Sequence, residues 1–531
     1  MIFDHSKIKP LSTNDLLETP LVQYLLEVCQ KQSEKIEELE AEIKQLKGHP
    51  QKPIIRPSKI ELPFKGPTSK KVEKRAGSEK RQKTRDLIIS KDEIIEAEGA
   101  GRDWVFKGYQ DYIVQDIKIE NYNVRYRLKR YVTPEGKYVT ASLPKEIEGC
   151  HFGASLRRFI LYQYYHCHVT QPILLEQLGE MGIDISSGGL SHILLENNEV
   201  FHQEKEALLV KGLEVSDFIQ SDDTGARHNG KNGYCTVICN DLFTYFKSGE
   251  SKSRINFLEL LRTPQYKDYQ INPYALGYMA QQNLPAKYQQ LFEGMSGEVY
   301  PDKASFEKFL TRSGIMAGYA VRTITEGGLI GSIMEHGINK ELAIISDDAG
   351  QFNVLAHGLC WVHAERNIQK TNCFTPGQEA LLEAKLESFW ELYRALKHYK
   401  KNAAQINKEE LSNQFDIIFS ERTGFFGLDQ NLEKIEKNKK ELLLVLDRPE
   451  IPLHNNTSER DIREYVKKRK ISGSTRSDEG QRCRDTFTSL KKTCRKNGIS
   501  FWDYIEDRIK MIMKIQPLPE LIVLAQKINT G

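Results

Sequence analysis

The first periodic hydrophobic pattern of the chain lies between residues 21 and 47. Mostly apolar positions recur there at spacings of three and four, with charged residues between them, at Val22, Leu25, Cys29, Gln32, Ile36, Leu39, Ile43 and Leu46. Four heptads with such a seam predict a short coiled coil that dimerises the protein. A single amphipathic helix packed on its own domain is the alternative. Gly48 and Pro50 end the helix in either case.

A basic segment follows, from residue 49 to 86. It is rich in Pro and Lys and poor in aromatic residues, so it has too little apolar surface to fold alone. We expect a disordered tether whose cations neutralise the phosphates of a polyanion, with an affinity that falls as salt rises. A linker that only keeps the chain in solution is the alternative.

The pattern then changes to strands and afterwards to helices. Residues 102–144 are dense in Tyr, Val and Ile and contain the turn signal "TPEGK", which predicts a small β-rich module. An apolar-periodic helix breaks at Gly182 to Asp184, and a second helix follows with Ser186 or Ser187 as its N-cap. This pair is typical of a DNA-binding helix-turn-helix, although ordinary cores also contain such pairs.

From about residue 214 the pattern is that of an α/β domain. Three strand-like runs, "EVSDFIQSDD", "GYCTVICND" and "LFTYFKS", precede the helical "SRINFLELLR". After a mixed insertion, "ELAIISDDAG" repeats the design of an apolar run followed by acids, and a last helical stretch starts after "PEIPLHNN". This element order is that of an RNase H-like fold, so the predicted class is a multidomain α+β protein with an RNase H-like core.

These changes of pattern set the boundaries of the predicted segments. They are an N-terminal helix or coiled coil at 1–48, a basic linker at 49–86, a β-rich module at 87–150, a helix-turn-helix-like DNA-binding region at 151–212, the first part of the catalytic core at 213–364 with an insertion at about 265–340, a helical insertion at 365–450, and the last part of the core with C-terminal helices at 451–531.

Composition sets limits on this scheme. With 531 residues, 39% of them hydrophobic, the chain is long enough for two to four domains. No apolar run approaches the length that a membrane span needs, so we expect a cytoplasmic protein that contacts no membrane. The nine cysteines include no CxxC pair, which argues against a disulfide framework and a zinc ribbon.

Three acidic residues stand where chain geometry would fix their side chains. Asp222 ends the first strand, Asp347 ends the "LAIIS" strand, and Glu459 lies in the first turn of the helix that "HNNTSER" begins. Mg²⁺ prefers oxygen ligands, and two such ions can clamp the attacking and leaving oxygens of a phosphodiester. A strand-terminal Asp alone is usually a solvated turn residue, so the prediction of a two-metal site rests on the three acids together.

Cations follow Glu459 on the same predicted helix. At about 100° per residue, several of them share the side of Glu459 and would face a phosphate backbone there. The predicted DNA-binding residues are Arg463, Lys467, Lys468, Arg469, Lys470 and Arg476. A solvated basic face is the alternative.

Cys360 and His363 form a C-x2-H pair soon after Asp347. A tetrahedral zinc site normally needs four ligands, and no second pair is evident. We therefore expect the two side chains to support the active site or contact substrate, with zinc binding as the less favoured alternative.

Three long motifs carry a family resemblance: "SDDTGARHNGKNGYCTVI", "ISDDAGQFNVLAHGLCWVHAERN" and "PLHNNTSERDIREYVKKRKISGSTRS". Over about residues 105–510 the chain resembles transposases of the insertion sequence 66 family, in the single-protein branch with the D-D-T-G-A-R-H motif. The resemblance implies a DDE transposase that exposes 3′ hydroxyls at element ends and joins them to target DNA. It places the family's three acids on Asp222, Asp347 and Glu459, with Asp223 and Asp348 supporting them without binding metal.

The resemblance also implies partners and cofactors. It implies two Mg²⁺ ions per active site, for which Mn²⁺ substitutes, a homodimer or higher oligomer, and a location in the bacterial cytoplasm at the nucleoid when DNA is bound. Residues 87–149 contain no cysteine, in contrast to the zinc module of many family members, so zinc is not expected. An RNase H-like nuclease without strand transfer and a transposase-derived DNA-binding regulator are the alternative functions.

Overall fold

The computed structural model describes residues 20, 22–32, 35, 88–96, 105–144, 151–404 and 406–530. The chain divides into two compact units, one formed by residues 1–32 and 124–531 and the other by residues 33–123. In the second unit, the described residues 88–96 and 105–123 hold no helix or strand and are exposed. The predicted basic linker lies outside the described residues, and all elements below belong to the first unit.

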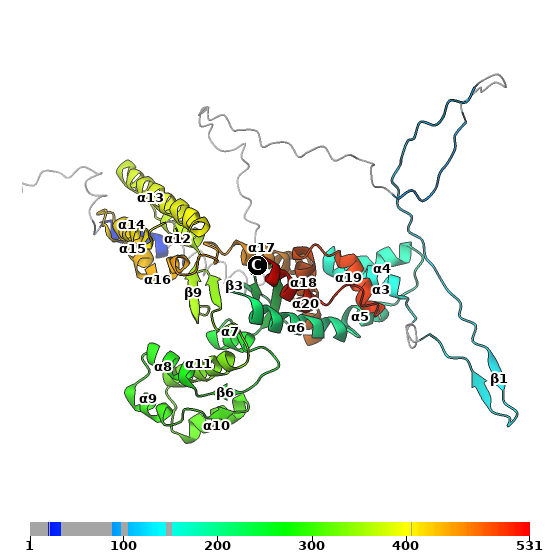
Figure 1. Ribbon diagram of the computed structural model, residues 1–531, viewed down its shortest axis with the longest axis horizontal. Coiled ribbons are helices and arrows are strands. Elements are labelled where there is room, and N and C mark those ends of the chain that lie inside the picture. Colours follow the sequence, from blue (N-terminus) through cyan, green and yellow to red (C-terminus); the bar gives the residue numbers. More distant parts are fainter. Residues whose placement is uncertain are drawn as a thin grey trace, which may run out of the picture. The chain divides into compact units, whose positions relative to one another are not determined.

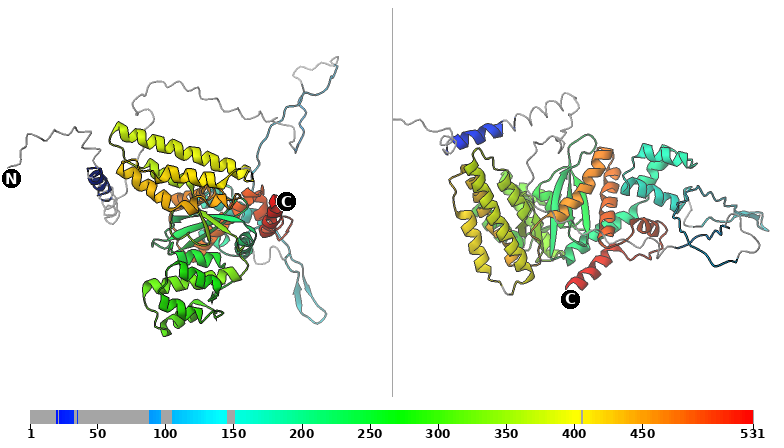
Figure 2. Two further views of the ribbon diagram at one scale, coloured as in Figure 1. Left: turned by 60° about the vertical axis from the view of Figure 1, so that its left-hand side comes forward. Right: turned by 90° about the horizontal axis from the view of Figure 1, so that it is seen from above.

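Residues 22–32 are helical, as the heptad pattern predicts, and they contact a helix far along the chain (Figure 2). The Phe426 backbone N–H donates to Gln23 Oε1 at 3.1 Å, and the Tyr24 ring meets the Phe426 ring edge-on. Leu25, a predicted seam residue, is half-exposed. The seam positions after residue 35 lie outside the described residues, so the predicted coiled coil stays a prediction.

The "TPEGK" turn joins a two-stranded hairpin, β1 (Arg130–Val132) and β2 (Tyr138–Thr140). Gly136 has φ +77°, a conformation that favours glycine, and its N–H donates to the Thr133 carbonyl. Both strands are exposed along their whole length. Within residues 88–96 and 105–144, this hairpin is the regular structure that the predicted β-rich module contains.

Helices make up the next segment. They are α3 (Ala154–Leu161), the π-helical η3 (Tyr162–His166), α4 (Gln171–Glu180), α5 (Ser187–Leu195) and α6 (Glu199–Val215). The predicted helix pair is present as α4 and α5, and Ser186 caps α5 by accepting a hydrogen bond from the Gly189 N–H. Whether the pair reads DNA stays a prediction.

A mixed five-stranded sheet follows, in the order β5-β4-β3-β8-β9. Its strands are β3 (Phe218–Gly225), β4 (Tyr234–Cys239), β5 (Thr244–Gly249), β8 (Ala343–Ser346) and β9 (Ala356–Leu359). β3, β4 and β5 form an antiparallel meander, while β8 and β9 continue the sheet parallel to β3. The mixed α+β class is confirmed. β9 was not predicted, because four residues without alternation carry too weak a signal.

Two helical segments interrupt the sheet-forming chain (Figure 1). Between β5 and β8 lie α7 (Arg254–Leu261), β6 (Tyr269–Gln270), α8 (Pro273–Gln281), α9 (Ala286–Glu293), β7 (Val299–Tyr300), α10 (Lys303–Arg312) and α11 (Gly318–Glu335). After β9 lie α12 (Trp361–Gln369), α13 (Pro376–Lys401), α14 (Lys408–Ser420), α15 (Phe426–Lys437), α16 (Lys439–Leu442) and the 3₁₀ turn η4 (Leu444–Leu446). α13, α14 and α15 lie side by side in both figures.

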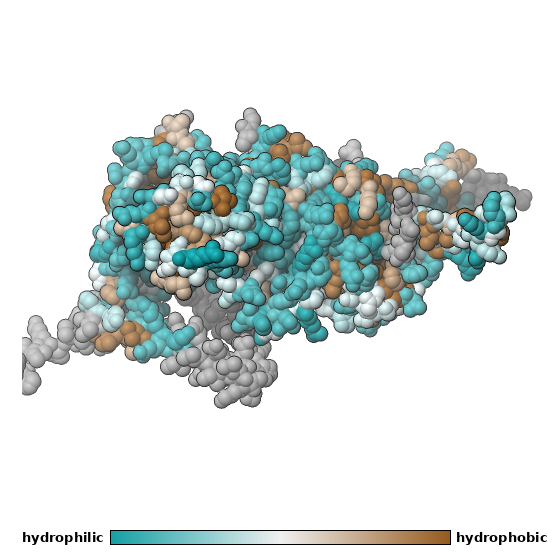
Figure 3. Space-filling view, turned by 90° about the horizontal axis from the view of Figure 1, so that it is seen from below, coloured by the Kyte–Doolittle hydropathy of each residue, from teal (hydrophilic) through white to brown (hydrophobic). Residues whose placement is uncertain are grey.

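The chain closes with α17 (Asn456–Ser472), α18 (Asp478–Lys496), α19 (Phe501–Ile509) and α20 (Leu518–Thr530). None of the described helices is both long and apolar enough to cross a membrane. The face drawn in Figure 3 is mainly hydrophilic, with hydrophobic residues in separate patches.

Along each strand of the sheet, successive side chains point to opposite faces, and both faces are buried. Ile219 belongs to the larger core, with residues of α6, α11 and α18. Val237 packs instead with Ile462 and Tyr465 of α17. Because side chains alternate along a strand, Gln220 and the residue two positions further point to the α17 face.

The edge strand β5 is covered by polar side chains of α18. Asp485, Ser489 and Thr493 accept hydrogen bonds from the backbone N–H groups of Ser248, Phe246 and Thr244, at 2.7, 2.8 and 3.1 Å. Residues four apart share one face of a helix, and alternate residues of an edge strand present their N–H groups to one side. The buried polar face of α18 therefore satisfies the open edge of the sheet.

Ser489→Ala should loosen this edge, because it leaves the buried Phe246 N–H without an acceptor. Exchange of the β5 amides, followed by hydrogen-exchange mass spectrometry, should accelerate by about tenfold. Thr488→Ala is the matched control, because the Thr488 hydroxyl donates only to the Arg484 carbonyl of its own helix. Equal exchange in both variants would show that α18 does not satisfy β5.

Candidate active site

The prediction that Asp222 ends its strand is wrong, because β3 continues to Gly225 as it pairs with β4, whereas Asp347 directly follows β8 as predicted. The register of β3 and β8 pairs Gln220 with Ile345, so Asp222 and Asp347 stand two residues beyond the same pair. Both residues therefore lie at the same end of the sheet, where the C-terminus of β8 is. Asp222 shares the strand face of Gln220, which is the face toward α17.

Two buried amide side chains attach the start of α17 to β3. Gln220 Oε1 accepts from the Thr457 N–H at 2.9 Å and from the Ser458 N–H at 3.4 Å. Asn455 Nδ2 donates to the Ser221 carbonyl at 2.8 Å. Gln220 thus caps the helix from another element, where free N–H groups need an acceptor, and it sets Glu459, in the first turn, close to the strand ends.

The charges at this place influence one another. Burial raises the pKa of Asp222 to about 7; the Asp223 N–H, donating to Asp222 Oδ1, opposes this, and the charges of Asp347, Asp223 and Glu459 add to the rise. Glu459 Oε1 is buried and accepts no hydrogen bond from the described residues. Acids whose charges act on Asp222, with an unsatisfied buried oxygen on one of them, fit a hard cation, which takes oxygen ligands, but their ligand atoms do not all lie within 4.8 Å of one another.

Two arginines and a histidine approach Glu459 without donating a hydrogen bond to it. Arg366 Nη1 lies 3.5 Å and His363 Nε2 3.8 Å from Glu459 Oε1, and Arg463 Nη2 lies 3.7 Å from Oε2. These are long ion pairs rather than hydrogen bonds. His363 and Arg366 share one side of α12 at a spacing of three, so a rigid helix presents both to the carboxylate.

Asp223 and Asp348 each accept hydrogen bonds from polar side chains of other elements or loops. Asp223 accepts from Thr236 Oγ1 and, at 2.7 Å, from Gln351 Nε2. Burial raises its pKa, and these two hydrogen bonds oppose the rise. Asp348 Oδ1 lies 3.5 Å from Asn438 Nδ2. That neither residue binds metal stays a prediction.

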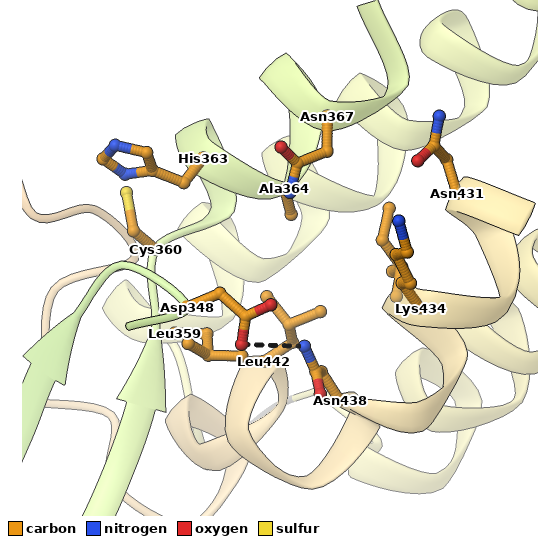
Figure 4. A pocket seen from close by; sticks show the side chains of 11 residues that line it. Asp348, Leu359, Cys360, His363, Ala364, Asn367, Asn431, Lys434, Asn438 and Leu442 are labelled. Carbon is orange, nitrogen blue, oxygen red and sulfur yellow. Dashed lines mark hydrogen bonds between the residues drawn. The ribbon is translucent and has the colours of Figure 1, made fainter. Parts of the chain in front are cut away.

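Cys360 and His363 lie together beside a cavity of about 30 Å³, which Asp348 also lines (Figure 4). The Cys360 thiol is buried, and Sγ accepts from the Asn455 N–H at 3.2 Å. The Cys360 N–H donates to the Ser346 carbonyl at 3.0 Å. Cys360 therefore joins the end of β8 to the start of α17, and the described residues bring no third metal ligand to the pair.

The predicted basic surface of α17 is only partly formed. Its exposed members are Arg463, Lys467, Lys470 and Arg476. Lys468 is buried: its Nζ donates to the Tyr164 carbonyl and lies over the Tyr164 ring, and burial lowers its pKa to about 7. Arg469 donates to Thr224 Oγ1 and to the Gly225 carbonyl, so it holds the end of β3.

Sequence reasoning missed Gln220, Asn455 and Arg366. Gln220 is a polar residue inside an apolar strand run, which was a usable signal of an interior hydrogen bond. Asn455 stands within the "HNN" stretch that correctly marks the helix start, but its side chain reaches β3 instead of capping α17. Arg366 had no local signal, because its partner lies 93 residues away.

Comparison with known proteins identifies the family of the chain. The pattern of the family described as "Transposase IS66 family" matches residues 343–483, from β8 into α18. The uncharacterized protein y4jO of Sinorhizobium fredii (strain NBRC 101917 / NGR234) is 42% identical over 318 residues, which cover 59% of this chain and 99% of that protein. The chain belongs to the IS66 transposase family. It is therefore a transposase of an insertion sequence, with DNA as its partner.

Asp222→Asn should stabilise the metal-free protein at pH 8, by about 2 kcal/mol, because it removes a buried charge from a cluster of like charges. Asp222 has a pKa of about 7 in the folded protein and about 3.9 when unfolded. As pH rises, the Asp222 carboxyl therefore loses its proton at lower pH in the unfolded chain than in the folded protein. The free energy of unfolding of the wild type falls between about pH 4 and pH 7. The gain in the variant should shrink as pH drops from about 7 toward 4.

Thermal melting across this pH range measures the effect, with the exposed Asp241→Asn as the control. Mg²⁺ should raise the melting temperature of the wild type and raise that of Asp222→Asn much less, because cation binding selects the folded state. A variant that is no more stable than the wild type at pH 8 would contradict the buried carboxylate cluster.

Proposed function

We propose that this protein is a DDE transposase with Asp222, Asp347 and Glu459 as its catalytic acids. It nicks element ends to expose 3′ hydroxyls and joins these ends to target DNA by transesterification. The proposal is carried by the position of Asp222 and Asp347 two residues beyond the same pair of β3 and β8, together with the pKa of Asp222, which burial raises and the charges of Asp347 and Glu459 raise further. The sheet order supports an RNase H-like core, because a three-strand antiparallel meander continues into two parallel strands.

The donor set fits Mg²⁺, since all three side chains offer carboxylate oxygens and Glu459 Oε1 lacks a hydrogen bond. When bound, two such ions lower the pKa of the attacking water or hydroxyl and stabilise the leaving 3′ oxygen. Asp222 and Asp347 hold the ligand oxygens on two strands of one sheet, and Glu459 adds a third from α17. The rigid attachment of α17 by Gln220 and Asn455 keeps the three in register.

Cations around the acids would bind the DNA backbone. Arg463, Lys467, Lys470 and Arg476 are exposed on or just after the helix that carries Glu459. Arg366 and His363 reach Glu459 from α12 and would orient it in the absence of DNA. The predicted coiled coil would pair two chains, so that two element ends meet two active sites.

Strand transfer is the decisive activity. With element-end DNA carrying a free 3′ hydroxyl, a target plasmid and Mg²⁺, each of Asp222→Asn, Asp347→Asn and Glu459→Gln should lower joining by at least about a thousandfold. All three should keep DNA binding, measured by mobility shift. Asp241→Asn, an exposed acid in the β4–β5 turn, is the control and should join at the wild-type rate.

Wild-type joining in all three variants would refute the assignment. Cutting of DNA without any joining would identify a nuclease. DNA binding with neither cutting nor joining would identify a regulator.

The DNA surface can be tested by salt dependence. Lys467→Ala combined with Lys470→Ala should weaken binding to all DNA sequences and reduce the slope of log affinity against log salt by about 2. Fluorescence anisotropy over a salt series measures the slope. Lys437→Ala with Lys440→Ala removes the same charge from exposed positions of the α15–α16 region and should leave the slope unchanged. Equal slopes in both double variants would exclude α17 from the DNA surface.

A further inference from the structure

A second group of metal-ligating side chains connects α6 with α18. His202 stands on α6, while Glu479 and Cys483 are four residues apart on one face of α18. His202 Nε2 lies 3.1 Å from Glu479 Oε1 and 3.7 Å from Cys483 Sγ, and Sγ lies 3.6 Å from Oε1. His202 and Cys483 are buried. Three different ligand types thus point their donor atoms at one place.

The spacing of these atoms matches a tetrahedral zinc ion. Zinc binds His nitrogen at about 2.0–2.1 Å, carboxylate oxygen at about 2.0–2.2 Å and Cys sulfur at about 2.3 Å. At tetrahedral angles, two such ligand atoms lie about 3.3–3.6 Å from each other. The three separations in the protein, 3.1, 3.7 and 3.6 Å, are therefore close to those of a zinc site. We propose that His202, Glu479 and Cys483 hold a zinc ion whose fourth ligand comes from solvent.

The surroundings prepare two of the three ligands for this role, whereas burial raises the pKa of the Cys483 thiol, which a bound ion would have to lower. His202 Nδ1 lies 2.8 Å from Thr486 Oγ1, and donation of its proton there leaves the Nε2 lone pair for the metal. The other carboxylate oxygen of Glu479 lies 3.9 Å from Arg482 Nη1, so Oε1 alone faces the site. The Glu479 side chain is 42% exposed, which leaves a fourth position for a solvent ligand.

The zinc ion would stabilise the fold and would take no part in the reaction on DNA. It ties α18, whose polar face covers the edge of β5, to α6 of the larger core. His202 and Cys483 are 281 residues apart, so no motif spacing reveals the site. It is separate from the Cys360–His363 pair, which gains no third ligand among the described residues.

Metal content and cobalt spectroscopy on the full chain test the proposal. Protein purified in Mg²⁺ buffer without chelators should retain about one zinc ion per chain. Replacement by Co²⁺ should give a thiolate-to-cobalt charge-transfer band. Cys483→Ser should abolish the band and the zinc, whereas Cys494→Ser and Cys360→Ser, which change other buried thiols, should keep both.

Glu479→Gln keeps the test decisive if Cys483→Ser does not fold. It should weaken zinc binding by at least about tenfold. A zinc-selective chelator should then lower the melting temperature of the wild type and not that of Glu479→Gln. No retained zinc, a band that persists in Cys483→Ser, or a band lost only in Cys360→Ser would overturn the site and leave a trio that is only hydrogen-bonded.

Discussion

The attachment of α17 to β3 is the interaction on which the candidate active site depends. Gln220 and Thr457 are 237 residues apart, yet the Gln220 amide caps the first turn of α17. Asn455 adds a hydrogen bond to the strand backbone beside Asp222. Since both side chains are almost fully buried, these hydrogen bonds are shielded from water and costly to lose. They fix the first turn of α17, which carries Glu459, beside the strand that carries Asp222.

Buried polar side chains also join elements by hydrogen bonds elsewhere in the interior. The face of α18 that lies on β5 consists of Asp485, Ser489 and Thr493, which supply acceptors that an apolar helix could not offer. Lys468 is likewise turned inward, onto a carbonyl and an aromatic ring. The cost of burying these groups is offset because each has a partner. Helices that read as solvated from composition are therefore structural parts of the core.

The insertions lengthen the chain between the site residues without disturbing the sheet. The segment from α12 to η4 has its own apolar core, which includes Phe389, Phe415 and Leu432 and also contacts Ile345 of β8. A segment with its own core can be placed between two sheet-associated elements at little energetic cost, because the ends to be joined already lie close together.

The sequence by itself determined the local features: the strands of the meander, Asp347 directly after β8, the helix start at "HNNTSER" and a serine cap at residue 186 or 187. These depend on periodicity and capping, which act over a few residues. Only the tertiary structure decided that Gln220 caps α17, that Lys468 is buried although its neighbours are exposed, and that His202 meets Cys483. Such contacts join residues hundreds of positions apart, and burial depends on what packs against a residue, which no local pattern encodes.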